Sequence, residues 1–134
     1  MEFIKQPTAC VAFDGTIVFY DGYKGIGKFG DVLPGVKEAL TLLKTQGWKI
    51  IVVTERFEYE LIGHYLRENG IPYDEINRNS DTIAPGTSET KVQADVYIDS
   101  RAVVVPKGGD WFEVLANAHE MILEKGLMPR FKKE

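Results

Sequence analysis

Short apolar runs alternate with amphipathic stretches along this chain, and that alternation restricts the fold more than any other feature. The runs are nearly unbroken, as expected for strands buried on both faces of a parallel sheet. They cover residues 9–13, 50–53, 96–98 and 102–105. Between and after them, three stretches carry apolar side chains at helical spacing. The order predicts an α/β domain of three layers, with a mainly parallel sheet flanked by helices.

The predicted helices have recognisable ends. The first, 34–46, begins with Pro34 and stops at Gly47, and the second, 57–69, stops at Gly70. The last begins at Asp110, which can cap it, and ends at Gly126. Only three residues separate the run 102–105 from the preceding run, too few for a parallel crossover. We therefore expect it to be antiparallel or an extension of the sheet edge.

Length and charge narrow the class of protein. A chain of 134 residues suits one domain, predicted to span 1–134, with a glycine-rich flap hairpin at about 17–32. The net charge of −4 comes without a long basic stripe, so nucleic acid is not an expected partner. No apolar stretch approaches the roughly 20 residues that cross a bilayer, and the start is too polar for a secretory signal. The expectation is a soluble, cytoplasmic protein without a membrane partner.

Polar residues follow the ends of three predicted strands. Asp14, Thr54 and Asp99 stand there, and the carboxyl ends of parallel strands meet at the edge where such sheets bind ligands. Lys91 lies eight residues before Asp99. Phosphoryl transfer requires a nucleophile, an acid or base, a cation or two and hydrogen-bond donors, and these four residues supply most of that list. Singly, each also fits an ordinary surface or strand-end residue; together they indicate one site.

The segment Ala12-Phe13-Asp14-Gly15-Thr16 resembles the first signature of the haloacid dehalogenase-like (HAD) phosphohydrolases, Asp-x-Asp-Gly-Thr, with alanine at the first aspartate. The resemblance extends from Ala9 to about Lys125 and implies a three-layer Rossmann-like HAD fold without a cap domain. It also implies an aspartyl-phosphate mechanism that hydrolyses phosphomonoesters with Mg²⁺ as cofactor. Ala12 can neither attack phosphorus nor bind the cation, so we expect this chain to be inactive and its affinity for Mg²⁺ to be weakened.

The resemblance gives each matching residue a role. Asp14 would shuttle the proton and offer its carbonyl to the metal, and Asp99 would bind the metal through its carboxylate. The candidate phosphate-binding residues are Gly15, Thr16, Thr54, Arg56 and Lys91. Two departures weaken the match, because Val92 replaces a common proline after the lysine and Ser100 replaces a second aspartate.

Several alternatives remain open. Asp14 itself could be the nucleophile with Thr16 two residues on, as in related ATPases, although Gly15-Thr16 aligns Asp14 with the second aspartate. Ala12 fits both an engineered substitution and a natural loss of catalysis. In the second case the chain would be a pseudo-phosphatase that binds phosphate or protein, or a structural subunit of an assembly. Without a cap, the expected partner is a phosphorylated and bulky substrate, a protein partner or a second copy of the chain.

Overall fold

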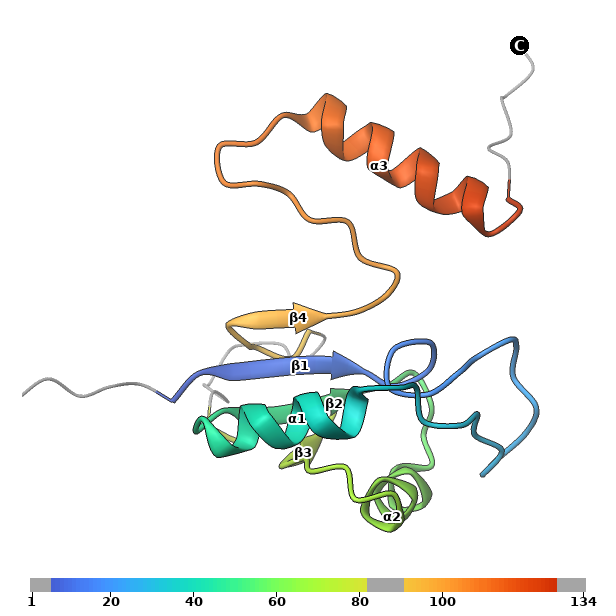
Figure 1. Cartoon of the computed structure of the whole chain (residues 1–134), viewed down its shortest axis with the longest axis vertical. Helices are drawn as coiled ribbons and strands as arrows, with labels where there is room; N and C mark the ends of the chain where they lie inside the picture. The colour runs from blue at the N-terminus through green and yellow to red at the C-terminus, as the bar shows by residue number, and fades with distance from the viewer. Residues whose placement is uncertain (1–5, 82–90, 128–134) are drawn as a thin grey trace, which may run out of the picture. The chain divides into compact units, whose positions relative to one another are not determined.

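A four-stranded parallel sheet forms the centre of the first part of the chain, in the order β3-β2-β1-β4 (Figure 1). The computed structural model describes residues 6–81 and 91–127. Strand β1 (Thr8–Ala12) pairs with β2 (Lys49–Val53) on one side and with β4 (Val96–Ile98) on the other. The short β3 (Glu75–Ile76) lies outside β2. The predicted α/β, Rossmann-like fold with a parallel sheet is confirmed.

Two helices connect consecutive strands of the sheet. Helix α1 (Val36–Thr45) leads from β1 to β2, and helix α2 (Tyr59–Glu68) leads from β2 to β3. Both lie within the predicted helical stretches, and Gly47 and Gly70 follow their ends closely, as expected. Leu61 is one of the apolar residues at helical spacing in the second stretch, yet it is 46% exposed.

The core forms on one face of the sheet. Since side chains alternate between faces along a strand, Ala9 and Val11 face the same way as their register partners Ile50 and Val52. These residues pack with the buried side chains of the helices: Leu40, Ile62 and Leu66. The opposite face is buried too, because Cys10 and Ile51 are 1% and 0% exposed.

The remaining chain forms a second unit, Arg101–Glu134. The expectation of a strand at 102–105 is wrong: the segment has no regular structure, and Val104 and Val105 are 78% and 48% exposed. A short apolar run does not by itself identify a strand, because it carries no information about a hydrogen-bonding partner.

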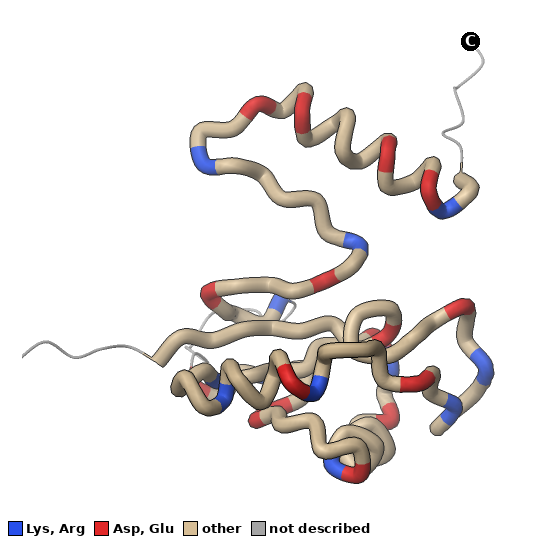
Figure 2. The backbone as a smooth tube through the Cα atoms, in the orientation of Figure 1, with Lys and Arg blue, Asp and Glu red and all other residues tan. Residues whose placement is uncertain are grey.

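Helix α3 (Trp111–Glu124) begins as predicted, with the Asp110 side chain accepting a hydrogen bond from the Phe112 N–H at 2.9 Å. Leu115, one of the apolar residues at helical spacing in this stretch, is 54% exposed, while Val114 is buried. Among the described residues, no helix combines the length and apolar character required to cross a membrane. Acidic and basic residues are interspersed along residues 6–81 and 91–127 (Figure 2).

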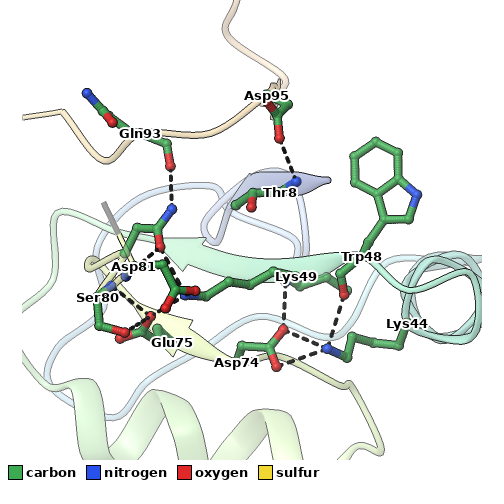
Figure 3. A network of polar contacts seen from close by, with 12 residues as sticks. Thr8, Lys44, Trp48, Lys49, Asp74, Glu75, Ser80, Asp81, Gln93 and Asp95 are labelled. Atoms are coloured by element: carbon green, nitrogen blue, oxygen red, sulfur yellow. Dashed lines mark hydrogen bonds and ion pairs between the residues drawn. The ribbon is translucent and has the colours of Figure 1, made fainter. Parts of the chain in front are cut away.

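A polar network holds the amino ends of the strands together (Figure 3). Asp74, just before β3, accepts the Ile50 N–H at 2.7 Å and binds the Lys44 ammonium at 2.8 Å. Asp95, just before β4, accepts the Thr8 N–H at 2.9 Å. Each aspartate thus ties its own strand to the first residues of the neighbouring strand.

Lys49 is the buried centre of this network. Its side chain is 10% exposed, and its ammonium contacts Glu75 at 2.8 Å, Asp81 at 2.7 Å and Asn79 at 2.9 Å. Burial alone would lower the pKa of Lys49, but the hydrogen bonds to Asp81 and Glu75 raise it above 10.5. The network lies at the end of the sheet opposite the polar residues singled out in the sequence.

Candidate functional site

The loop after β1 is a tight turn. The Phe13 carbonyl accepts hydrogen bonds from the N–H groups of Thr16, Ile17 and Val18 at 3.3, 2.9 and 3.2 Å. Gly15 has a φ of +83°, a left-handed conformation that glycine adopts without steric cost. This turn places Asp14 just beyond the carboxyl end of β1.

Asp14 is held by a fork from Arg56. The Arg56 Nε donates to Asp14 Oδ2 at 2.8 Å, and Nη2 donates to Oδ1 at 3.1 Å. The Arg56 side chain is 7% exposed and that of Asp14 is 21% exposed, so the pair is shielded from water. Hydrogen bonding to Asp14 raises the pKa of the Arg56 guanidinium, although burial acts in the opposite direction. Both Asp14 oxygens are therefore committed to Arg56.

A second carboxylate shares the same guanidinium. Arg56 Nη1 donates to Glu58 Oε1 at 3.2 Å, and the Glu58 side chain is 4% exposed. The other oxygen, Oε2, is buried and accepts no hydrogen bond from the described part of the chain. One guanidinium therefore contacts two carboxyl groups, Asp14 and Glu58.

Thr54, at the end of β2, is fixed through Asn77. The Thr54 N–H donates to Asn77 Oδ1 at 2.7 Å, and Asn77 Nδ2 donates to the Thr54 carbonyl at 2.6 Å. The Thr54 hydroxyl oxygen accepts the Arg56 N–H at 3.0 Å and keeps its own proton for donation. Arg56 thus contacts Thr54 through its backbone N–H and Asp14 through its side chain.

Sequence reasoning missed Asn77 and Glu58. Asn77 has a φ of 56°, and asparagine tolerates this left-handed conformation better than most residues with a side chain. An asparagine directly after the short β3, where a turn residue is expected, was the available signal. Glu58 gave no signal, since a glutamate near a helix start is usually solvated.

Asp99 and Ser100 reach the loop after β1 from β4. The Ser100 N–H donates to Thr16 Oγ1 at 3.0 Å, and a side chain at Gly15 would meet Ser100 Oγ at 3.4 Å. Since Asp99 follows β4 and β4 pairs with β1, this carboxylate belongs to the same edge of the sheet. The structure therefore gathers Asp14, Thr54 and Asp99 at the carboxyl ends of three neighbouring strands.

Lys91 lies elsewhere on the sheet. Its ammonium is 4.6 Å from the centroid of the Tyr97 ring, and Tyr97 is the register partner of Cys10. Burial raises the pKa of the Cys10 thiol to about 11, while the charge of Lys91 acts to lower it. Cys10 faces the same side of the sheet as Ala12 but precedes it by one strand repeat, about 6.6 Å. Lys91 is therefore set back from the Asp14 and Thr54 edge.

The donor atoms do not fit a tight magnesium site. Mg²⁺ requires near-octahedral oxygen ligands and usually takes one or two carboxylates from the protein. Ala12 has no oxygen, and the Asp14 carboxylate is held by Arg56. Over residues 6–81 and 91–127, no three side chains of His, Cys, Asp or Glu gather in a way that could hold a metal ion. Of the predicted magnesium ligands, the Asp99 carboxylate and the Asp14 carbonyl oxygen belong to this edge of the sheet.

Comparison with known proteins gives one informative similarity. No protein-family model matches the chain, and no curated protein sequence matches it. The solved structure of a conserved protein from Bacteroides thetaiotaomicron is 32% identical in sequence and has a TM-score of 0.60. The match covers 90% of this chain and 93% of that one.

Proposed function

This chain belongs to the family of that conserved Bacteroides thetaiotaomicron protein, and we propose that it is an HAD-like phosphohydrolase domain without its nucleophile. The order of Asp14, Thr54, Lys91 and Asp99 supports the proposal, as does the position of three of them at one edge of a parallel sheet. The chemistry for which the site is built is hydrolysis of a phosphomonoester through an aspartyl-phosphate.

The methyl group of Ala12 is the observation that carries the proposal. Ala12 is the last residue of β1, 7% exposed, and precedes Asp14 by two positions in a tight turn. A carboxylate there would stand beside the Asp14 loop; a methyl group can neither attack phosphorus nor contribute to a metal site. The chain as it stands should therefore have no covalent phosphatase activity.

The remaining residues have separate roles in the proposal. Asp14 would exchange the proton with the leaving group, and the Thr54 hydroxyl would donate to a phosphoryl oxygen. Lys91, on its flexible four-carbon stem, would supply positive charge from the neighbouring sheet face. The predicted phosphate contact of Arg56 is the least supported, because its fork already holds Asp14.

Restoring the nucleophile tests the proposal. Hydrolysis of p-nitrophenyl phosphate with Mg²⁺ should be at background for the unchanged chain and for Ala12→Asn. Ala12→Asp should exceed that background by about a hundredfold or more, because it supplies both the attacking oxygen and a third metal ligand. In the double variant with Asp14→Asn, this gain should be lost.

A binding module is the second candidate, and the Arg56 cluster favours it. Retaining two carboxylates and a guanidinium away from water is costly, yet the cluster is intact in a chain without a nucleophile. If Ala12→Asp folds and stays silent while binding of inorganic phosphate or a protein partner is preserved, the binding module replaces the first proposal. If the unchanged chain hydrolyses the substrate and Asp14→Asn abolishes that activity, both candidate functions are contradicted.

A further inference from the structure

We propose that Arg56 is a positioning residue that ties the segment of residues 20–30 to the Asp14 carboxylate. This segment, called the hairpin below, lies between Val18 and Val32, which form an antiparallel bridge. The orientation of Asp14 and the closed position of the hairpin would then depend on a single guanidinium. This inference rests on the proposed function only where it treats Asp14 as part of a phosphate site. The contacts between Arg56 and the hairpin stand without it.

One nitrogen of Arg56 joins the two parts directly. Nη2 donates to Asp14 Oδ1 at 3.1 Å and to the Lys28 carbonyl at 3.2 Å. The second terminal nitrogen, Nη1, donates to the Gly25 carbonyl at 3.4 Å and to Glu58 Oε1 at 3.2 Å. The guanidinium therefore holds hairpin backbone and site carboxylates with the same donors.

Aromatic rings of the hairpin strengthen this connection. The Arg56 Cζ lies 5.1 Å from the Tyr23 ring centroid and 5.0 Å from that of Phe29, within cation–π range. Phe29 also makes an edge-on contact with Phe13, the residue directly before Asp14, with centroids 5.3 Å apart. The hairpin is thus packed against both the guanidinium and the loop that it positions.

The contacts require the shape of arginine as well as its charge. A guanidinium is planar and presents five donors in a rigid fork, and Arg56 uses Nε, Nη1 and Nη2 on carboxylates or carbonyls. A lysine ammonium is a point charge with three donors and cannot span Asp14, Glu58 and two hairpin carbonyls at once. Arg56→Lys and Arg56→Gln should therefore have similar consequences for the hairpin.

Trypsin can measure hairpin closure, because Lys24 and Lys28 are exposed and the carbonyl of the Lys28 cleavage site is the one that Arg56 holds. Initial cleavage rates at these two lysines would be compared among the unchanged chain, Arg56→Lys, Arg56→Gln and Asp14→Asn. Arg67→Lys is the matched control, since Arg67 is an exposed arginine bonded to the Tyr73 hydroxyl. Both Arg56 variants should be cut about tenfold faster or more, and the control at the unchanged rate.

Asp14→Asn keeps Arg56 and its hairpin carbonyls, so its cleavage should increase less, by about threefold. A folded Arg56→Lys protein with unchanged cleavage would overturn the proposal, since charge alone would then suffice. If circular dichroism shows the Arg56 variants unfolded, Asp14→Asn decides: faster cleavage supports the coupling and an unchanged rate overturns it.

A parallel measurement separates this inference from the proposed function. Inorganic phosphate with Mg²⁺ should slow cleavage at Lys24 and Lys28 in the unchanged chain and lose that effect in Arg56→Lys. If phosphate has no effect on the unchanged chain while Arg56→Lys still accelerates cleavage, the phosphate site fails and the tie between Arg56 and the hairpin holds.

Discussion

Thr8 and Asp95 bind each other twice at the amino end of the sheet: the Thr8 N–H donates to Asp95 Oδ2, and the Asp95 N–H donates to the Thr8 carbonyl, both at 2.9 Å. Ile50 and Asp74 repeat the arrangement, at 2.7 and 2.8 Å, between β2 and β3. Two edge strands are therefore aligned by the same device, an aspartate placed just before the strand.

Removing one of these carboxylates should destabilise the fold. Asp95→Ala leaves the Thr8 N–H without its charged acceptor, so the free energy of unfolding should fall by about 1–3 kcal/mol. Urea denaturation followed by circular dichroism would measure it. Asp21→Ala is the control, because Asp21 faces Lys24 in an exposed pair and should change stability by no more than about 0.5 kcal/mol. Equal losses in the two variants would contradict the role of Asp95.

Arg56 and Glu58 should respond unequally to neutralisation. Arg56→Gln leaves the buried Glu58 carboxylate and the partly buried Asp14 carboxylate without their cation, and should cost about 3–5 kcal/mol of stability. Glu58→Gln keeps an acceptor for Arg56 and replaces the unbonded Oε2 of a charged group by a neutral amide, so it should cost about 1 kcal/mol or less. Chemical denaturation of both variants measures the two losses of stability. A larger loss for Glu58→Gln than for Arg56→Gln would contradict the prediction.

Asn77 should be difficult to replace. Asn77→Ala removes both hydrogen bonds to the Thr54 backbone and replaces asparagine by a residue that tolerates a φ of 56° less well, so it should destabilise the protein by about 2–4 kcal/mol. Asn77→Gly removes the hydrogen bonds but relieves the backbone, and should cost less. Thermal unfolding would measure both, with the exposed Asn69→Ala as control; a near-zero effect for Asn77→Ala would show that Thr54 is held by other contacts.

The Lys49 network predicts a dependence of stability on acid. Burial would raise the pKa of Glu75, but hydrogen bonds from Lys49 and Ser80 outweigh it and lower the pKa below 4.5. A lowered folded-state pKa means that Glu75 contributes stability above its unfolded pKa, and the contribution disappears as pH falls through the folded value. The stability difference between the unchanged chain and Glu75→Gln should therefore be largest near pH 7 and shrink below pH 4.5.

Lys49 predicts a dependence of stability on alkaline pH. Its raised pKa means that its contribution persists below 10.5 and is lost as pH rises through the folded-state value. Urea denaturation across pH would reveal both the acidic limit set by Glu75 and the alkaline limit set by Lys49.

Glu68→Gln is the control for Glu75→Gln, because Glu68 pairs with His64 while 61% exposed. A parallel pH profile for the two glutamate variants would contradict the assignment.

Cys10 should be nearly inert in the folded protein. With a pKa of about 11, only about a thousandth of the thiol is ionised at pH 8, and the side chain is buried. Reaction with Ellman's reagent should be slow under native conditions and fast in urea. Because the charge of Lys91 lowers the thiol pKa, Lys91→Met should slow the native reaction further. An unchanged or faster reaction in that variant would place the ammonium away from Cys10.

The sequence predicted the parts of the fold that depend on local pattern. The strands around Cys10 and Ile51 were recognisable because residues buried on both faces of a sheet form short apolar runs. The apolar run 96–98 also marked a strand, but the expected burial is wrong there, since Tyr97 at its centre is 43% exposed. Helix boundaries followed from glycines and from the Asp110 cap. The run at 102–105 was misassigned because a short apolar stretch by itself carries no information about available hydrogen-bonding partners.

The candidate site was predictable in outline and not in its contacts. Strand ends brought Asp14, Thr54 and Asp99 to one edge, as parallel topology requires. The bond between Asp14 and Arg56 spans 42 residues, and only the folded chain shows which cation meets which carboxylate. Asn77 and Glu58 were missed for the same reason, since their importance comes from neighbours far along the chain.

The aspartates that precede β3 and β4 have a consequence for the opposite end of the sheet. Displacing β1 by a single residue against its neighbours would exchange its two faces, turning Cys10 toward the helices and Val11 away from them. The same displacement would move Asp14 along the strand axis by about 3.3 Å, out of reach of the Arg56 fork. Carboxylates that never approach a ligand thereby determine which side chains can meet one.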